Sequence, residues 1–420
     1  MRRVPGLAGA GPASVGGPQT GLRRRRLLRG LSLAAALALA AAARLLRPAF
    51  LERARGGGGL DTPAELQLQL PLPRRLQRFV NASRAEVTAI LRGEDDRLLA
   101  IVGPCSIHDP PAAREYAHRL RQVATAHKEN LLVLMRAYLE KPRTSVGWRG
   151  LVSDPDLSGA EDLERGVALG RRVLLDVSAA GLPVAVEFLD PLAAPYFEDL
   201  VTYGSIGART VESPTHRALA AGLPMPIGFK NSRSGDVQSA VNAVVAAAAP
   251  QRRLAVDAAG RLHVAQAHGN AAGHVVLRGG EGGPNYESDS VLEAAGQLAK
   301  EGFEGPRVVV DCSHGNSGKQ LEGQLEACRS VAGQVAGSES GDVVSGVMIE
   351  SFLEAGNQKL EPGTTRPSEL QYGCSVTDAC LDFGMTETLL GELSHAVEAR
   401  RERRTLSWSE ASGARPAGSS

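Results

Sequence analysis

The sequence predicts a (β/α)8 barrel with an N-terminal extension and an inserted β-hairpin. Three observations support this fold class. Eight short apolar runs, each typical of a buried strand, follow one another between Leu98 and Glu350. Segments with helical periodicity separate most of them, and this alternation fits a closed parallel barrel better than an open doubly wound sheet. Many of the 48 glycines directly follow the apolar runs, as expected where strands end in tight loops.

The elements follow in chain order from these patterns. The predicted strands are Leu98–Cys105, Leu131–Ala137, Val184–Leu189, Ile206–Val211, Pro226–Lys230, His274–Arg278, Arg307–Asp311 and Gly346–Glu350. The predicted helices are Ala85–Arg92, Ala112–His127, Leu163–Ala180, Ser239–Ala248, Ser290–Glu301 and Lys319–Ala336. Leu254–Ala258 and Leu262–Ala267 flank a Gly-Arg turn, which predicts a hairpin inserted before the sixth strand.

The composition divides the chain into four parts. Residues 1–59 form a targeting or disordered extension, 60–97 an N-terminal arm, 98–399 the catalytic barrel, and 400–420 a disordered tail. The extension holds eleven arginines and one glutamate, and the uncharged run Gly30–Ala43 follows four consecutive arginines. This pattern is typical of a signal-like core joined to an organelle presequence, and a plastid is the favoured destination. A cytoplasmic protein with a disordered start and a membrane anchor are the alternatives.

Charge and cysteine content restrict the class of protein further. The net charge is +1, and because the positive excess lies in the extension, the rest of the chain is mildly acidic. Such a body argues against general nucleic-acid binding. The five cysteines are unevenly spaced, which does not resemble a disulfide framework and suits a reducing compartment.

Cations follow the predicted strands at the end where barrels carry their chemistry. A single strand-end cation is commonly a structural ion pair or a solvated loop charge. A converging set exceeds what the nearby acids can neutralise, which indicates that phosphate groups bind there. The set is Arg136, Lys141, Arg209, Lys230 and Arg278. Arg143 and Thr144, in the loop after the second strand, could bind a second phosphate.

A second set of strand-end residues suits a metal ion. Cys105 ends the first strand, His314 follows the seventh, Glu350 ends the eighth, and Asp378 lies beyond it. Sulfur, nitrogen and two oxygens form a donor set for a divalent transition metal. Local spacing gives little support, because neither CxxC nor HExxH occurs, and a lone strand-end cysteine is more often a small core residue.

Seven motifs together carry a resemblance to a known family. They are Gly103-Pro104-Cys105-Ser106, Lys141-Pro142-Arg143-Thr144, Gly207-Ala208-Arg209-Thr210, Gly228-Phe229-Lys230-Asn231, Leu277-Arg278-Gly279-Gly280, Asp311-Cys312-Ser313-His314 and Gly356-Asn357-Gln358. In this order and spacing, from about Asp95 to Ala399, the chain resembles type I 3-deoxy-D-arabino-heptulosonate 7-phosphate (DAHP) synthase. The resemblance implies a metal-dependent (β/α)8 enzyme, usually a dimer or tetramer. It also implies condensation of phosphoenolpyruvate with erythrose 4-phosphate at the entry to the shikimate pathway.

The resemblance also implies residue roles. Cys105, His314, Glu350 and Asp378 would bind the metal, which is Mn, Fe, Co or Zn. Arg136, Lys141, Arg209, Lys230 and Arg278 would bind phosphoenolpyruvate, and Arg143 and Thr144 the aldose phosphate. Lys141, between the two substrate sites, is the candidate proton donor, and Arg136 and Lys230 complete the expected catalytic set.

Some positions depart from the family pattern. Asn231-Ser232-Arg233-Ser234-Gly235 and Val256–Gly260 differ from the usual motifs, and residues 60–95 match poorly. Pro224 and Ala194-Pro195 replace residues of the feedback-inhibitor pocket. We therefore expect inhibition by Phe, Tyr or Trp to be altered or lost. Cys380, two residues beyond Asp378, could approach Cys105, so that oxidation would join the two thiols; an inert buried thiol is the alternative.

Three other functions remain open at this point. An octulosonate 8-phosphate synthase of the same superfamily would use arabinose 5-phosphate, although the Lys-Pro-Arg-Thr motif favours the shorter aldose. A silent paralogue would keep the barrel as a binding or regulatory subunit, although every predicted metal and cation position is present. A metal-dependent aldolase that uses pyruvate would not need so many phosphate-binding cations.

Overall fold

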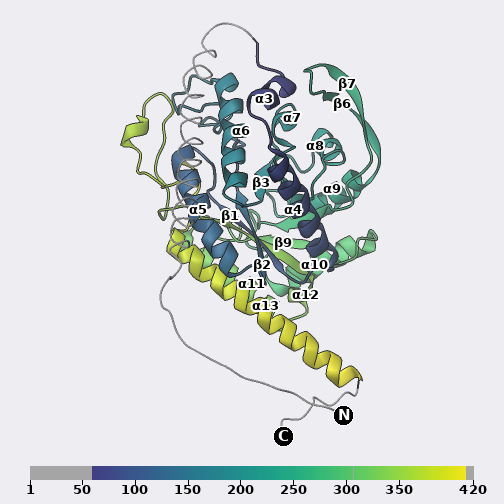
Figure 1. The fold of residues 1–420 in the computed structure, drawn as a ribbon. Coiled ribbons are helices and arrows are strands. Elements are labelled where there is room, and N and C mark those ends of the chain that lie inside the picture. The colour runs from purple at the N-terminus through teal and green to yellow at the C-terminus, as the bar shows by residue number, and fades with distance from the viewer. Residues whose placement is uncertain (1–58, 306, 413–420) are drawn as a thin grey trace, which may run out of the picture. The chain divides into compact units, whose positions relative to one another are not determined.

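Eight parallel strands close into a barrel in the computed structural model of this chain, which describes residues 59–305 and 307–412 (Figure 1). The barrel strands are β1 (Leu98–Gly103), β2 (Leu131–Arg136), β3 (Val184–Glu187), β4 (Tyr203–Ile206), β5 (Ile227–Lys230), β8 (His274–Leu277), β9 (Val308–Asp311) and β10 (Val344–Glu350). Around the barrel they follow the order β1-β10-β9-β8-β5-β4-β3-β2. The predicted fold class is therefore confirmed.

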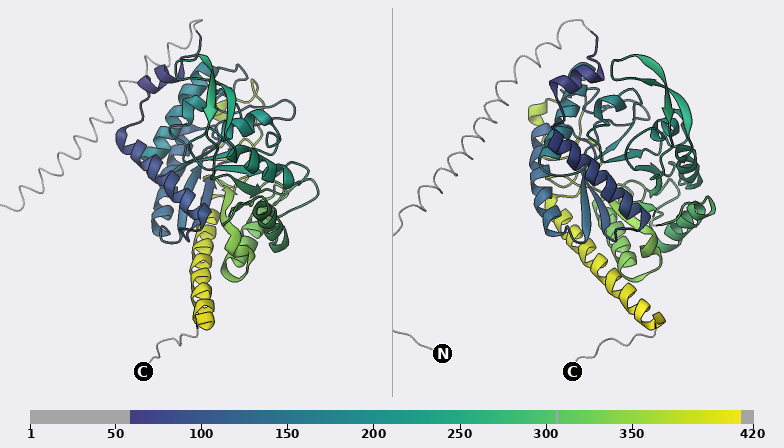
Figure 2. Two further views of the ribbon diagram at one scale, coloured as in Figure 1. Left: turned by 90° about the vertical axis from the view of Figure 1, so that its right-hand side faces the viewer. Right: turned by 45° about the vertical axis from the view of Figure 1, so that its right-hand side comes forward.

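Helices pack around the barrel, most of them between consecutive strands and the others before the first strand or after the last (Figures 1 and 2). They are α3 (Pro63–Gln69), α4 (Arg74–Arg92), α5 (Pro110–Ala126), α6 (Leu163–Ala179), α7 (Ala194–Phe197), α8 (Pro214–Ala220), α9 (Gln238–Ala248), α10 (Ser288–Lys300), α11 (Leu321–Gly337), α12 (Ser340–Val343) and α13 (Phe383–Ser412), with a 3-10 turn η1 at Pro367–Glu369. Asp109 and Asp162 accept backbone N–H groups at the starts of α5 and α6, as N-cap residues do.

The strands are continuous apolar runs because helices outside and packed side chains inside bury both of their faces. Every residue of β1, β2 and β10 is buried. Helix α4 closes one end of the barrel, where Val87, Ile90 and Leu91 pack in one cluster with inward-facing strand residues such as Leu99 and Tyr203. Figure 2 shows α4 lying across this end of the barrel. The polar groups of the site lie at the opposite, carboxyl-terminal end of the strands.

One strand differs from its prediction. The sequence favoured Ile206–Val211, whereas β4 spans Tyr203–Ile206, and the chain turns directly afterwards. The Gly204-Ser205 pair in β4 is typical of a loop, but packing requires the glycine. A Cβ on Gly204 would lie 2.4 Å from Cδ1 of Ile227 and 2.8 Å from the Phe188 ring. Local pattern therefore placed this strand too far along the chain.

The inserted hairpin is present as predicted. Strands β6 (Gln251–Val256) and β7 (Leu262–Ala267) pair antiparallel outside the barrel, and the first begins three residues earlier than expected. The N-terminal arm reaches the hairpin turn, since Ala64 N donates to Ala258 O at 2.8 Å. The N-terminal arm is therefore hydrogen-bonded to the turn of the inserted hairpin.

The tail differs most from the sequence prediction. Helix α13 continues through Ser412, although disorder was expected after Arg400. Acidic side chains of the body stabilise this extension, because Arg401 pairs with Asp96 at 2.6 Å and Arg403 with Asp342 at 2.7 Å. The basic composition that suggested a tail therefore reflects ion pairs with distant segments. No helix among the described residues is long and apolar enough to cross a membrane. The predictions for 1–58 and 413–420 fall outside those residues.

Candidate active site

The parallel register of the barrel brings the predicted residues to one end. Gly103 of β1 lies opposite Glu350 of β10, and Met348 lies opposite Asp311 of β9. Cys105, two residues beyond β1, therefore lies beside the end of β10. The sequence predicted this convergence from strand ends alone, and the structure places the side chains in contact.

Three of the four predicted metal-binding residues form a tight cluster. The donor atoms of Cys105, Glu350 and Asp378 all lie within 4.8 Å of one another. Cys105 and Glu350 are fully buried, and Asp378 is half-buried in the loop that follows β10. The Asp378 backbone N–H lies 3.4 Å from the Cys105 Sγ. The loop is therefore held against the thiol.

His314 lies beside this cluster. Its Nε2 is 3.6 Å from Oε1 of Glu350, and its Nδ1 is 2.9 Å from Oδ2 of Asp311. A carboxylate on one imidazole nitrogen leaves the other free to bind a metal, an arrangement common among metal-binding histidines. His314 has φ of +59°, a strained value for a residue with a side chain.

The four side chains fit a divalent transition metal in donor type and charge. Burial, with the Glu350 charge beside it, raises the pKa of Cys105, so the thiol is protonated until a cation displaces the proton. Burial alone would raise the pKa of Asp378, but Lys141 and His314 hold it at about 2. The carboxylate is therefore charged at neutral pH, as a metal ligand must be.

Arg136 lies in the floor of the site with its side chain fully buried. Its Nη2 donates to Oε1 of Glu350 at 2.8 Å and to Cys105 O at 3.1 Å. Its guanidinium carbon lies 3.5 Å from the centre of the Tyr138 ring. Burial would lower the pKa of Arg136, but Tyr138 and Glu350 raise it, so the guanidinium stays charged.

Lys141 joins the cation set to the metal cluster. Its Nζ lies 3.1 Å from both the Sγ and the carbonyl oxygen of Cys105. Burial would lower its pKa, but Cys105 and Glu350 raise it above the ordinary value. Lys141 therefore holds a proton directly beside the cluster.

Lys230 ends β5 and is buried beside an acidic partner. Its Nζ donates to Oδ2 of Asp311 at 2.9 Å. Burial alone would raise the pKa of Asp311, but His314 and Lys230 hold it well below its ordinary range. Asp311 thus connects Lys230 to His314, which is a predicted metal ligand. The sequence placed this aspartate at a strand end but gave it no role.

The remaining predicted residues lie at the rim. Arg209 stands in the turn beyond β4, and its Nε donates to Oγ1 of Thr144 at 3.3 Å, so two predicted phosphate-binding groups touch. Arg278 directly follows β8, and its buried Nε has no hydrogen-bond partner. The Arg143 Nε donates to the carbonyl of Trp148 within its own loop, 2.8 Å away.

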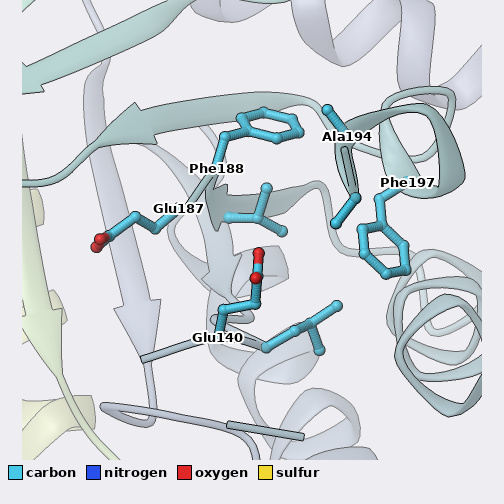
Figure 3. Close-up of a pocket in the computed structure, with 8 residues that line it drawn as sticks. Glu140, Glu187, Phe188, Ala194 and Phe197 are labelled. Carbon is cyan, nitrogen blue, oxygen red and sulfur yellow. The ribbon is translucent and has the colours of Figure 1, made fainter. Parts of the chain in front are cut away.

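Two glutamates near the site were not predicted to matter. Glu140 points into a pocket between Phe188, Ala194 and Phe197, whereas Glu187 points away from it (Figure 3). Burial is the main cause that raises the pKa of Glu140 to about 7. Oε1 of Glu187 is buried without a hydrogen-bond partner. In the sequence, the signals that could have identified them are that Glu140 precedes Lys141 and that Glu187 lies near the end of a predicted strand.

The geometry defines a class of protein, a parallel barrel with a candidate metal site beside a group of cations, and comparisons with known proteins identify the family. The DAHP synthetase I family model matches residues 76–391. A Trp-sensitive phospho-2-dehydro-3-deoxyheptonate aldolase of Enterobacter agglomerans is 47% identical over 345 residues, which cover 82% of this chain and 96% of that protein. The Phe-sensitive enzyme of Escherichia coli K12 is 44% identical over 339 residues, with 81% and 95% covered.

A solved structure shows the same fold. The phospho-2-dehydro-3-deoxyheptonate aldolase of Francisella tularensis SCHU S4 superimposes with a TM-score of 0.78 at 43% identity, and the match covers 82% of this chain and 99% of that one. The chain belongs to the DAHP synthetase I family. The family resemblance found in the sequence is thereby confirmed.

Proposed function

We propose that this chain is a metal-dependent DAHP synthase. In this proposal the strand-end cations bind the substrates, and the neighbouring cysteine, histidine and carboxylates bind the metal. The enzyme condenses phosphoenolpyruvate with erythrose 4-phosphate and water to DAHP and phosphate, the first step of the shikimate pathway to chorismate and the aromatic amino acids. The observation that carries the proposal is the contact of two of these cations, Arg136 and Lys141, with a Cys–Glu–Asp cluster at one end of the barrel.

Phosphoenolpyruvate binds on the cation set. Its carboxylate and phosphate carry more negative charge than a buried pocket tolerates without partners. The cations that serve as partners for these two groups are Arg136, Lys141, Arg209, Lys230 and Arg278. Arg143 and Thr144 hold the phosphate of erythrose 4-phosphate in the loop after β2, and the Arg209–Thr144 contact connects the two phosphate sites. Binding on adjacent sites orients the two reacting carbons.

Cys105, His314, Glu350 and Asp378 hold a divalent metal, which we propose to be Mn, Fe, Co or Zn. When bound, the metal supplies Lewis-acid polarisation of the aldehyde carbonyl. Asp311 supports this set through Nδ1 of His314 and is itself neutralised by Lys230.

The chain's own groups then guide the bond changes. C3 of phosphoenolpyruvate attacks the aldehyde carbon, and Lys141 gives its proton to the oxygen that becomes a hydroxyl. Water adds at C2, where positive character has developed, and one of its protons returns to Lys141. The other proton leaves with the phosphate as the C2–O bond to phosphate breaks and the C2 carbonyl forms. Arg136 and Lys230 hold the phosphate and carboxylate through these steps and offset their charge.

The direct test is turnover by the purified full-length chain. We expect loss of phosphoenolpyruvate and formation of a heptulosonate phosphate with erythrose 4-phosphate and Mn²⁺, and no product when a chelator is present. Arabinose 5-phosphate should not replace erythrose 4-phosphate. Product with arabinose 5-phosphate alone would indicate the octulosonate enzyme, and no turnover by folded, metal-loaded protein would indicate a silent paralogue.

Three further features belong to this proposal. The enzyme forms a homo-oligomer, a dimer or tetramer, which sedimentation would measure. The arginine-rich residues 1–59 direct it to an organelle, with a plastid favoured, and an intact Met1 on the native protein would contradict cleavage. Feedback inhibition is altered or lost because Pro224 and Ala194-Pro195 change the inhibitor pocket. Micromolar inhibition by Phe, Tyr or Trp would contradict that loss.

A further inference from the structure

Tyr138 contacts two cations of the substrate site although the roles above leave it without a function. We propose that Tyr138 is a positioning residue that holds Arg136 and Lys230 in place for phosphoenolpyruvate through the face of its ring. The inference rests on the proposed function, because it assumes that these two cations bind that substrate.

The Tyr138 ring is fixed at both of its ends. The side chain is 1% exposed, and its backbone carbonyl accepts the N–H of Ile107 at 2.9 Å. Its hydroxyl lies 2.6 Å from Oγ of Ser205. Oγ of Ser205 also lies 3.3 Å from Val186 O, and the Tyr138 hydroxyl lies 3.7 Å from Sδ of Met348. A ring anchored in this way presents a fixed face.

Both cations lie over the Tyr138 ring. The Arg136 guanidinium carbon is 3.5 Å from the ring centre, and Lys230 Nζ is 5.6 Å from it. Cations within about 6 Å of an aromatic ring centre are attracted by its negative face. The two like charges repel each other, and one ring attracts both. The ring therefore offsets part of the cost of keeping two cations close together.

An aromatic face attracts a cation without neutralising its charge, whereas a carboxylate neutralises it. Arg136 also pairs with Glu350, and Lys230 pairs with Asp311. A carboxylate neutralises its partner and competes with an anionic substrate for the same N–H groups. An aromatic face attracts a cation by its charge distribution and leaves the N–H groups of that cation available for hydrogen bonds with the substrate. The contact with Tyr138 therefore orients the cations and leaves their charge for the substrate.

The test measures phosphoenolpyruvate binding alone to the metal-loaded full-length enzyme by calorimetry. Tyr138→Phe keeps the ring face, Tyr138→Leu removes it, and pentafluorophenylalanine at position 138 keeps the volume but reverses the charge of the face. We expect Tyr138→Phe to bind within about twofold of wild type. The leucine and fluorinated variants should bind about tenfold more weakly. The KM for phosphoenolpyruvate should rise in parallel, while that for erythrose 4-phosphate stays within about twofold.

The phenylalanine and fluorinated variants form a matched pair, because both lack the hydroxyl and both fill the same space. Equal affinity of these two variants would overturn the inference, even if Tyr138→Leu fails to fold. A large loss in Tyr138→Phe would also overturn it, since the hydroxyl rather than the ring would then act. A wild-type enzyme that does not bind phosphoenolpyruvate would instead overturn the proposed function.

Discussion

Replacing Cys105 with alanine is expected to remove the metal and to lower turnover by roughly 10³-fold or more. A Lewis acid stabilises the transition state by several kcal/mol, which corresponds to a rate factor of about this size. Cys105 is the only sulfur in the three-residue cluster that the described residues form, and its donor atom lies within 4.8 Å of those of Glu350 and Asp378. Its removal leaves two carboxylates and an imidazole, a weaker set for a transition metal. Metal content after gel filtration and kcat on the same sample check this prediction.

Cys328→Ala is the matched control. This cysteine is as deeply buried, in helix α11, but it is not among the clustered donors. The control should keep a full complement of metal and near-normal turnover. Its free energy of unfolding should fall by a similar amount, because it leaves a similar cavity. Full metal content in Cys105→Ala, with the protein folded, would refute the assignment of this thiol as a ligand.

Lys141→Met is expected to keep the metal and to lose about 10²- to 10⁴-fold in kcat, the usual range for a positioned proton donor. The Lys141 Nζ lies 3.1 Å from the Cys105 Sγ, so the two substitutions alter neighbouring groups, but only Cys105→Ala is expected to remove the metal. Methionine preserves most of the volume of the side chain and removes only the ammonium group. Metal analysis together with single-turnover rates measures the two effects separately.

Lys141→Arg distinguishes proton donation from charge. Arginine keeps the positive charge that binds phosphoenolpyruvate, but its guanidinium does not release a proton in proteins. We therefore expect substrate affinity close to that of wild type and turnover as low as in Lys141→Met. Near-normal turnover in either variant would assign the proton transfer to another group.

The sequence predicted the barrel because its signals were local. Each buried strand in a parallel barrel is a continuous apolar run, and each intervening helix repeats its apolar residues every three to four positions. Six predicted helices and seven of the eight strands agree with the structure, although α4 starts at Arg74 rather than Ala85. The exception, β4, carries Gly204 because Ile227 of β5 and Phe188, directly after β3, crowd that position. No local pattern contains that information.

The extension of α13 was missed for a similar reason. Its basic residues were interpreted as a solvated tail, whereas Arg401 and Arg403 pair with acids that lie hundreds or tens of residues earlier in the chain. Composition reports charge but not the partner that neutralises it. The position of Tyr138 over Arg136 and Lys230 was missed because an aromatic residue two positions after a strand is ordinary in sequence.

The sequence alone determined which residue types stand at the ends of the strands, and with them the fold class, the family and the candidate ligands and cations. It could do so because a parallel barrel places every strand end on one face, whatever the intervening helices. Only the tertiary structure decided which groups touch. It paired Lys230 with Asp311, placed Lys141 against Cys105, and placed Nε2 of His314 beside Glu350. Contacts between residues distant in sequence depend on the register and closure of the whole sheet, which no single segment specifies.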